Sequence, residues 1–554
     1  MTTSLAAKNS LFSWEKVWLA LLGIVSIGTQ VYIALTPTTS LLRWFHIDDA
    51  FYYYQVAANV AQGTGVTFDG LSHTNGFHPL WLLLNVPVFA LKGVDPLLPL
   101  RIVVVMEGFL NVAAGILLFR GARRFFAPWV AALMATVWMF APTIFAQVMV
   151  GGLETSLNAA FLAWFWERMT FFQATHRWSQ LTKRGWLLGV VSGLTILSRL
   201  DSVFVVGVFW LWLAWKIGSA YGWHRWQDWM RVLARAAAPA IALVGGYLLW
   251  SQWYVGNWYP VSAAVKHWWG VKGDTVYGPP RQPRWIDSVR WVRTKPFWWL
   301  NGWLEHSQHW LAAFLGAAAD RLRWALVLWA FLLALGGKAL KDNILRALIG
   351  LWLGAALLHA VYYEVVPYTG ERPWYWVQET MGGVLLMGAL MDAGWRRGVR
   401  ERDFPRAAFI IGSVIVLAGG LGHIKNVLRS YPLHPDDREH IYFSSTRWLE
   451  EHTKPGTLIG MTGAGSTGYF IHDRTIEPLD GLINGYAYFE ALKTGRAAEY
   501  LSAIGLDYVF AKDFVQTGEP YAKAFKGRLQ PVADYLYSPN GEPTHLWRFL
   551  PVVP

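Results

Sequence analysis

Long apolar segments alternate with short polar ones along most of this 554-residue chain. Windows of roughly 15 to 22 apolar residues are long enough to cross the hydrocarbon core of a bilayer as helices. The pattern therefore predicts a polytopic helical membrane protein with about eleven spans. We expect these spans near residues 17–36, 98–119, 128–148, 155–172, 185–198, 203–217, 233–254, 324–337, 344–365, 376–394 and 405–423.

Lys and Arg residues gather in every second loop between these spans. Short loops rich in Lys and Arg stay on the cytoplasmic side of a membrane. We therefore expect a cytoplasmic N-terminus, a C-terminus on the extracytoplasmic face and a multi-pass location in the cell (inner) membrane. Three large segments then lie outside: a first loop at about 37–97, a second loop at about 255–323 and the chain from 437 onward.

The chain after residue 436 has a different pattern. Helix-like stretches at 444–451 and 497–504 alternate with strand-like stretches at 457–461 and 508–511, which is typical of a small α/β unit. We expect residues 1–436 to form the transmembrane region and residues 437–554 to form a soluble extracytoplasmic α/β domain. The fold class is therefore mainly α, a polytopic transmembrane helical bundle with an appended α/β domain.

Composition agrees with this class and removes others. Hydrophobic residues make up 54% of the chain and charged residues only 15%, which is typical of membrane proteins. The net charge of +12 does not indicate nucleic-acid binding, because the basic residues are spread over loops rather than gathered in one stripe. The absence of cysteine excludes disulfides, thiolate zinc sites and a cysteine nucleophile.

Two adjacent acids, Asp48 and Asp49, follow the first span on the predicted outer face. They open an amphipathic segment that runs to Gly63, and paired carboxylates at a membrane surface are costly unless they are used. The alternative is that Asp48 caps this helix while Asp49 complements its dipole. Other polar residues on the same face favour a functional role.

Other polar residues that could bind a substrate lie at the outer ends of predicted spans and in the outer loops. Lys266 is a candidate phosphate ligand because a flexible ammonium can reach a lipid-linked phosphate, and Arg372 is a second. Each has an ordinary alternative, either a snorkelling side chain or a local ion pair. The candidate substrate-binding residues are Asn75, His78, Glu154, Arg199, Asp201, Asn257, Lys266, His267, Arg372 and Tyr375.

One motif in the C-terminal region matches a cofactor-binding pattern, but its surroundings do not support a cofactor. The segment Gly463–Gly468 matches the GxGxxG pattern that binds a pyrophosphate after a strand. The acid Asp480, downstream of the motif, comes too early for the ribose contact. We interpret the motif as a tight strand-to-helix turn that needs permissive backbone angles.

The paired acids, the segment Thr74–Trp81, the segment Gly152–Thr155 and the run from Gly256 to Lys266 resemble bacterial GT-C glycosyltransferases. The mycobacterial arabinofuranosyltransferases and other enzymes that use polyprenyl-phosphate sugars are similar. The resemblance implies an inverting transfer from a polyprenyl-phosphate sugar to an extracytoplasmic hydroxyl on a glycan, lipid or protein.

In that family an outer-loop acid is the catalytic base, which by position falls on Asp48, with Asp49 as the alternative. The resemblance also allows a divalent cation that bridges Asp48, Glu154 and phosphate, although the sequence requires no cofactor. Two other functions stay open from the residues alone. A lipid-linked-sugar flippase or transporter would have as many spans, and a non-catalytic scaffold could carry a glycan-binding domain.

Overall fold

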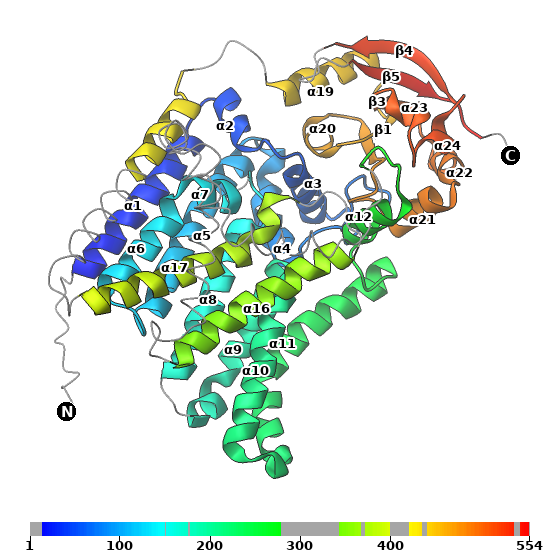
Figure 1. The fold of residues 1–554 in the computed structure, drawn as a ribbon. Coiled ribbons are helices and arrows are strands. Elements are labelled where there is room, and N and C mark those ends of the chain that lie inside the picture. The colour runs from blue at the N-terminus through cyan, green and yellow to red at the C-terminus, as the bar shows by residue number, and fades with distance from the viewer. Residues whose placement is uncertain are drawn as a thin grey trace, which may run out of the picture.

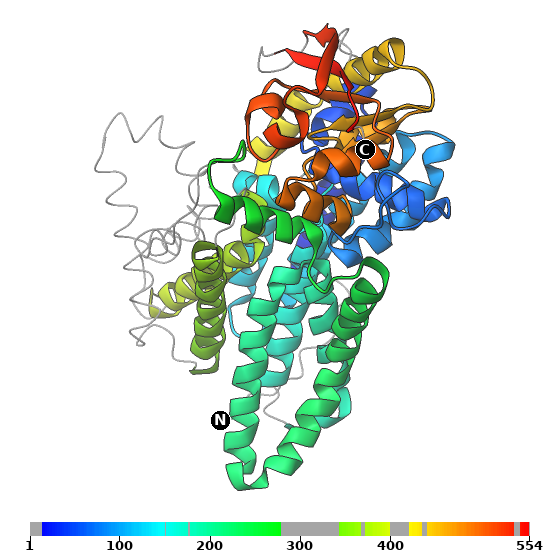
Figure 2. The same cartoon turned by 90° about the vertical axis from the view of Figure 1, so that its right-hand side faces the viewer.

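The computed structural model describes residues 14–149, 151–174, 178–278, 343–366, 372–398, 420–434, 440–536 and 543–552. Within these ranges the protein has a helical bundle at one end and a small α/β unit at the other (Figure 1). The two long helices α10 and α11 extend away from the α/β unit (Figure 2).

In the described ranges, ten helices belong to the bundle. The closest packing occurs between α9 and α11 and between α5 and α8, where glycines let the helices approach. A Cβ on Gly189, for example, would lie 2.1 Å from the carbonyl oxygen of Ala236. The helices are α1 (Trp14–Ala34), α5 (Leu98–Ala122), α6 (Pro128–Phe140), α7 (Pro142–Val148), α8 (Thr155–Ala174), α9 (Trp178–Ser198), α10 (Val203–Tyr221), α11 (Trp226–Val255), α16 (Asn343–Val365) and α17 (Val377–Gly398).

Helices therefore occur at nine of the predicted spans. Of the described helices, four are apolar and long enough to cross a membrane by themselves: α1, α5, α10 and α11. The pair α6 and α7, bent by 60° at Pro142, makes a fifth if it crosses as one unit. Charged residues near one end of α8 and α9, such as Glu167 and Lys183, shorten their apolar stretches. The predicted span at 324–337 and most of that at 405–423 lie outside the described residues. The expected count of about eleven is thus not established.

The segment at about 37–97, predicted to lie outside and called the first outer loop below, folds into short helices against the bundle. They are α2 (Thr38–Trp44), α3 (Asp49–Ala61), α4 (Pro79–Phe89) and the 3-10 turn η1 (Ala90–Gly93). Pro79 begins α4, where a missing N–H costs nothing. In the second outer loop, α12 (Val261–Lys272) follows α11 and lies against the α/β unit (Figure 1).

The α/β unit contains the four elements predicted from the sequence. The helix predicted at 444–451 is α19 (Ile441–His452), and the helix at 497–504 is α22 (Ala497–Ala503). The two predicted strands are β1 (Leu458–Met461) and β3 (Tyr508–Ala511). The proposed domain boundary at 437 lies among residues 435–439, which are not described.

A five-stranded mixed sheet organises this unit, in the order β2-β1-β3-β5-β4. The strand β1 pairs in parallel with both β2 and β3, whereas β5 pairs antiparallel with β3 and β4. The remaining elements are β2 (Thr475–Pro478), β4 (Leu529–Tyr535), β5 (Thr544–Phe549), α20 (Gly465–Phe470), α21 (Tyr486–Thr494), α23 (Phe514–Thr517) and α24 (Ala522–Phe525).

The α/β unit and the first outer loop share one hydrophobic core. Phe51 of α3 packs between Tyr469 and Phe470 of α20, with ring centroids 5.5 and 5.6 Å away. The aromatic ring of Tyr54 stacks on Phe89 and also contacts Tyr469. Burial of so many rings, each worth about 1.5–3 kcal/mol, makes the contact between the two parts extensive.

Candidate active site

A cavity of about 340 Å³ lies where the bundle, the first outer loop, α12 and the α/β unit meet. Its wall combines residues from the start of α3, the loop before α8, the turn between α9 and α10, and the 3-10 turn η5 (Pro373–Trp376). Leu482 and Ile483 of the α/β unit complete the wall. Segments far apart in the sequence thus surround one polar, aromatic space.

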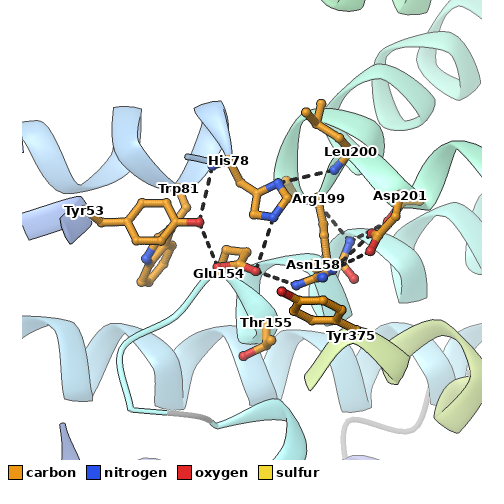
Figure 3. A network of polar contacts seen from close by, with 12 residues as sticks. Tyr53, His78, Trp81, Glu154, Thr155, Asn158, Arg199, Leu200, Asp201 and Tyr375 are labelled. Carbon is orange, nitrogen blue, oxygen red and sulfur yellow. Dashed lines mark hydrogen bonds and ion pairs between the residues drawn. The ribbon is translucent and has the colours of Figure 1, made fainter. Parts of the chain in front are cut away.

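Three charged residues form a buried network on the bundle side of the cavity (Figure 3). The Nη1 group of Arg199 donates to Glu154 Oε1 at 2.6 Å, and its Nε donates to Asp201 Oδ2 at 3.0 Å. The guanidinium also lies 4.6 Å from the centroid of the Tyr375 ring. Because two carboxylates and one ring hold it, Arg199 is fixed in orientation and its charge is balanced.

The loop that carries Glu154 is fixed from behind by a buried acid. Glu107 of α5 accepts hydrogen bonds from the indole of Trp44 at 2.8 Å and from the backbone N–H of Gly152 at 3.2 Å. The carbonyl of Gly152 accepts from the Tyr54 hydroxyl at 2.9 Å. Glycine is required at 152, because its φ is +84° and a Cβ would lie 1.7 Å from the Tyr54 hydroxyl oxygen.

Tyr53 and His78 extend this network into the cavity. The Tyr53 hydroxyl donates to Glu154 Oε2 at 3.0 Å and accepts from the His78 backbone N–H at 3.3 Å. His78 Nδ1 accepts from the backbone N–H of Leu200 at 3.4 Å, so Nε2 carries the proton and points toward Glu154 at 3.5 Å. Burial lowers the pKa of His78, which favours the neutral ring.

Lys266 is the second cation of the cavity. It lies on α12, and its Nζ donates to the Tyr375 hydroxyl at 2.7 Å. Among the residues that the structure describes, Lys266 contacts that neutral hydroxyl and the aromatic ring, whereas Arg199 contacts two carboxylates. Of the two, Lys266 has the charge that an incoming anion can neutralise.

The paired acids of the first loop have different surroundings. Asp49 lines the cavity. Asp48 stands at the N-cap position of α3, yet it makes no cap bond there. Its carboxylate instead accepts from the backbone N–H groups of Gly465 and Ser466, at 2.8 and 2.7 Å, at the start of α20.

The structure brings only some of the predicted substrate-binding residues to the cavity: His78, Glu154, Arg199, Asp201, Lys266 and Tyr375. The side chain of Asn75 is instead used internally, because it donates to Ser251 and accepts from the Val261 N–H. Asn257 accepts from the Tyr259 N–H in its own turn. His267 and the exposed Arg372 are not among the described residues that line the space.

The suggested cation ligands do not come together as one set. Asp48 accepts two backbone N–H bonds, and both oxygens of Glu154 are engaged by Tyr53 and Arg199. In the described part of the chain, no group of three His, Asp or Glu side chains is placed to hold a metal ion. The residues present therefore do not fit a carboxylate-held cation between Asp48 and Glu154, and no chemical step is assigned to one.

Several cavity residues were not singled out from the sequence. Tyr52, Tyr53 and Tyr363 line the space, and Glu107 and His359 are buried charged or polar groups behind it. Ionisable residues inside predicted spans were the available signal for Glu107 and His359. The tyrosines gave no such signal, because aromatic residues at membrane interfaces are common.

No protein-family model matches this chain, and no curated protein matches it at a significant level. Solved structures do. The apo oligosaccharyltransferase of Archaeoglobus fulgidus is similar over 98% of this chain and 75% of its own, with a TM-score of 0.54 and 12% identity. ArnT of Cupriavidus metallidurans in the apo state is similar over 97% of this chain and 98% of its own, with a TM-score of 0.52 and 11% identity.

The chain therefore has the fold of the GT-C glycosyltransferases, a class of multi-pass membrane proteins. The same ArnT has also been solved bound to undecaprenyl phosphate, and that structure covers 96% of this chain with a TM-score of 0.52. A likeness at 11–12% identity establishes the fold. The activity has to be argued from the cavity.

Proposed function

We propose that this protein is a membrane glycosyltransferase that moves a sugar from a polyprenyl-phosphate donor to an acceptor hydroxyl on the extracytoplasmic face of the inner membrane. The observation that carries the proposal is the cavity, where three carboxylates (Asp49, Glu154 and Asp201) and two cations (Arg199 and Lys266) line the same space. A displacement at a sugar carbon needs a base for the attacking hydroxyl and positive charge for the leaving phosphate.

Asp49 is the better candidate for the base. Its side chain lines the cavity, whereas the Asp48 carboxylate accepts two backbone N–H groups of α20. In the proposed step, Asp49 accepts the acceptor's hydroxyl proton while that oxygen bonds to the anomeric carbon. The bond from that carbon to the phosphate oxygen breaks, and the configuration inverts because there is a single displacement.

Lys266 is the proposed partner of the leaving phosphate. Its ammonium is oriented by the Tyr375 hydroxyl and forms no ion pair with a carboxylate in the described part of the chain, so it can neutralise charge that develops on the phosphate. Arg199, with both neighbouring carboxylates already bound, serves to hold Glu154 and Tyr375 in place. The apo and undecaprenyl-phosphate-bound structures of ArnT support a lipid phosphate as the donor's leaving group.

The identity of the sugar and that of the acceptor are separate predictions. The resemblance to arabinofuranosyltransferases makes an arabinofuranosyl donor the first to test, and tyrosines and His78 around the space suit a hydroxylated ligand. A glycan, a lipid or a protein could supply the accepting hydroxyl. A divalent cation held away from the Asp48–Glu154 pair is a further proposal, supported by a zinc- and sulfate-bound structure of the A. fulgidus enzyme with a TM-score of 0.50.

The test is sugar release or transfer by detergent-purified protein given a panel of polyprenyl-phosphate sugars. Asp49→Asn should lower turnover by about 10²–10⁴-fold, the usual contribution of a general base. Asp95→Asn is the matched control, since this exposed acid of the same loop caps the Leu97 N–H and lies outside the cavity lining. Full activity of Asp49→Asn would overturn the assignment, and movement of the carrier across vesicles without sugar release would favour the flippase alternative.

A further inference from the structure

The glycine-rich turn after β1 has the form of an anion-binding turn, and the anion that it binds here belongs to the protein. The backbone N–H groups of Gly465 and Ser466 point at the Asp48 carboxylate, at 2.8 and 2.7 Å. Backbone N–H groups at a helix start are natural partners of a negative charge. Asp48 lies 417 residues from Gly465 in the chain.

Each glycine of the GxGxxG segment has a separate steric reason. Gly463 has a φ of +65°, in the left-handed region. A Cβ on Gly465 would lie 2.3 Å from the Asp48 carbonyl oxygen, and a Cβ on Gly468 would lie 2.5 Å from the ring of Phe68. Two of the three glycines are therefore needed for contact with the first outer loop.

A second set of hydrogen bonds links the same turn to the cavity wall. The Tyr52 hydroxyl donates to Asp480 Oδ2 at 2.6 Å and accepts from the Ala464 N–H at 3.3 Å. Asp480 Oδ1 accepts from the backbone N–H of Leu482 at 2.9 Å. Leu482 and Tyr52 both line the cavity, so the turn and the cavity wall are fixed together.

We propose that Asp48 is a positioning residue, whose carboxylate docks the glycine-rich turn of the C-terminal α/β unit onto the first outer loop and so assembles one wall of the cavity. The paired acids then have separate roles, with Asp48 holding the turn and its neighbour Asp49 facing substrate. The effect on turnover rests on the proposed function, whereas the docking itself does not.

Docking is measured first, without any assay of activity. Hydrogen exchange of residues 463–470 should be roughly tenfold faster in Asp48→Ala, because two backbone N–H groups lose their acceptor. Gly465→Ala should give a similar change from the opposite side of the contact. Gly93→Ala is the matched control, as a Cβ there would meet nothing within 4 Å. Unchanged exchange in both Asp48→Ala and Gly465→Ala would overturn the proposal.

A disulfide can replace the lost contact, because the chain contains no cysteine. A Cβ on Gly485 would lie 3.1 Å from the Cβ of Ser72 in the first outer loop, near the separation of about 3.5–4.5 Å in disulfides. Gly485 has a φ of −75°, which any residue can adopt. The pair Ser72→Cys and Gly485→Cys should therefore crosslink the first outer loop to the α/β unit.

The crosslink separates docking from chemistry. If Asp48 acts through docking, Asp48→Ala should lose at least tenfold in turnover when the cysteines are reduced and recover most of it when they are oxidised. Asp49→Asn should stay inactive in both states. A crosslinked Asp48→Ala that remains inactive, while the crosslinked parent is active, would assign Asp48 to the chemistry and overturn the proposal. If the parent transfers no sugar from any donor, the proposed function fails and the exchange data alone decide the docking.

Discussion

Two groups of buried or half-buried carboxylates lie around the cavity, and they are stabilised in different ways. Glu154 and Asp201 share the guanidinium of Arg199. Within the described residues, Asp48 and Asp480 form no ion pair and instead accept from backbone N–H groups and a tyrosine hydroxyl. For Asp48 and Asp480 the effect of burial on the pKa is larger than that of these hydrogen bonds.

The comparison shows that the cavity is assembled from a rigid half and an adjustable half. The ion-paired group is held by helices of the bundle and keeps its charges fixed. The dipole-held group joins two parts of the chain that are separate in sequence, and its carboxyl groups respond to pH. Burial raises the pKa of Asp48 to about 6 and also raises the pKa of Asp480.

The largest effect is expected on breaking the ion-paired group. Arg199→Met should destabilise the protein by about 3–5 kcal/mol, because the buried Glu154 loses its arginine partner and, among the described residues, Asp201 keeps only His359 as an ion-pair partner, 3.5 Å away. Thermal unfolding in detergent measures the loss. The control is Arg225→Met, whose pair with Asp228 is exposed and worth less than about 1 kcal/mol. Similar melting of the two variants would show that the network is solvated.

A smaller effect should follow from disturbing the backbone behind Glu154. Gly152→Ala combines an unfavourable φ with a Cβ that would lie 1.7 Å from the Tyr54 hydroxyl oxygen, so we expect a cost of about 2–4 kcal/mol and loss of turnover. Gly28→Ala in α1 has open space around its Cβ and should melt like the parent. An active, stable Gly152→Ala would mean that this loop repositions freely.

The dipole-held group predicts a pH dependence. A carboxyl whose pKa is raised on folding, as for Asp48 from 3.8 to about 6, adds stability that is complete below the unfolded pKa and lost as the pH rises through the folded pKa. The free energy of unfolding should thus be larger at pH 5 than at pH 8, by about 1.4 kcal/mol for this residue, and thermal unfolding at the two pH values measures the difference.

Asp48→Asn is the control for that measurement, because an amide does not titrate. The difference between pH 5 and pH 8 should shrink in this variant and persist in Asp95→Asn. A parent protein whose stability rises from pH 5 to pH 8, with the same rise in Asp48→Asn, would contradict the expected sign.

The smallest change in stability is expected at the second cation. Lys266→Met keeps an aliphatic side chain but loses the charge, so donor affinity or turnover should fall about 10–100-fold. The free energy of unfolding should stay within about 0.5 kcal/mol of the parent. Steady-state kinetics over donor concentration measure the effect. Lys272→Met, six residues later on the same helix and paired with Glu519, is the matched control. Equal kinetics of the two variants would remove Lys266 from phosphate binding.

Local patterns in the sequence predicted much of the fold. The apolar windows gave nine helices at the expected places, and alternation gave β1 and β3. The strands β2, β4 and β5 were not predicted. The strand β4, for example, is largely exposed and lacks a clean alternation of buried residues. The number of true crossings was not determined either, because charged turns in α8 and α9 shorten their apolar stretches.

By itself, the sequence determined which segments are apolar, where acids and bases lie relative to them, and that paired acids stand beside the first span. Only the tertiary structure decided that Asp49 lines the cavity while Asp48 accepts two N–H groups of a turn over 400 residues away. The physical reason is that helix and strand periodicities are local, whereas the partner of a buried carboxylate is chosen by long-range packing. The glycine-rich turn is the clearest case, since its motif indicates an anion and only the fold identifies that anion as Asp48.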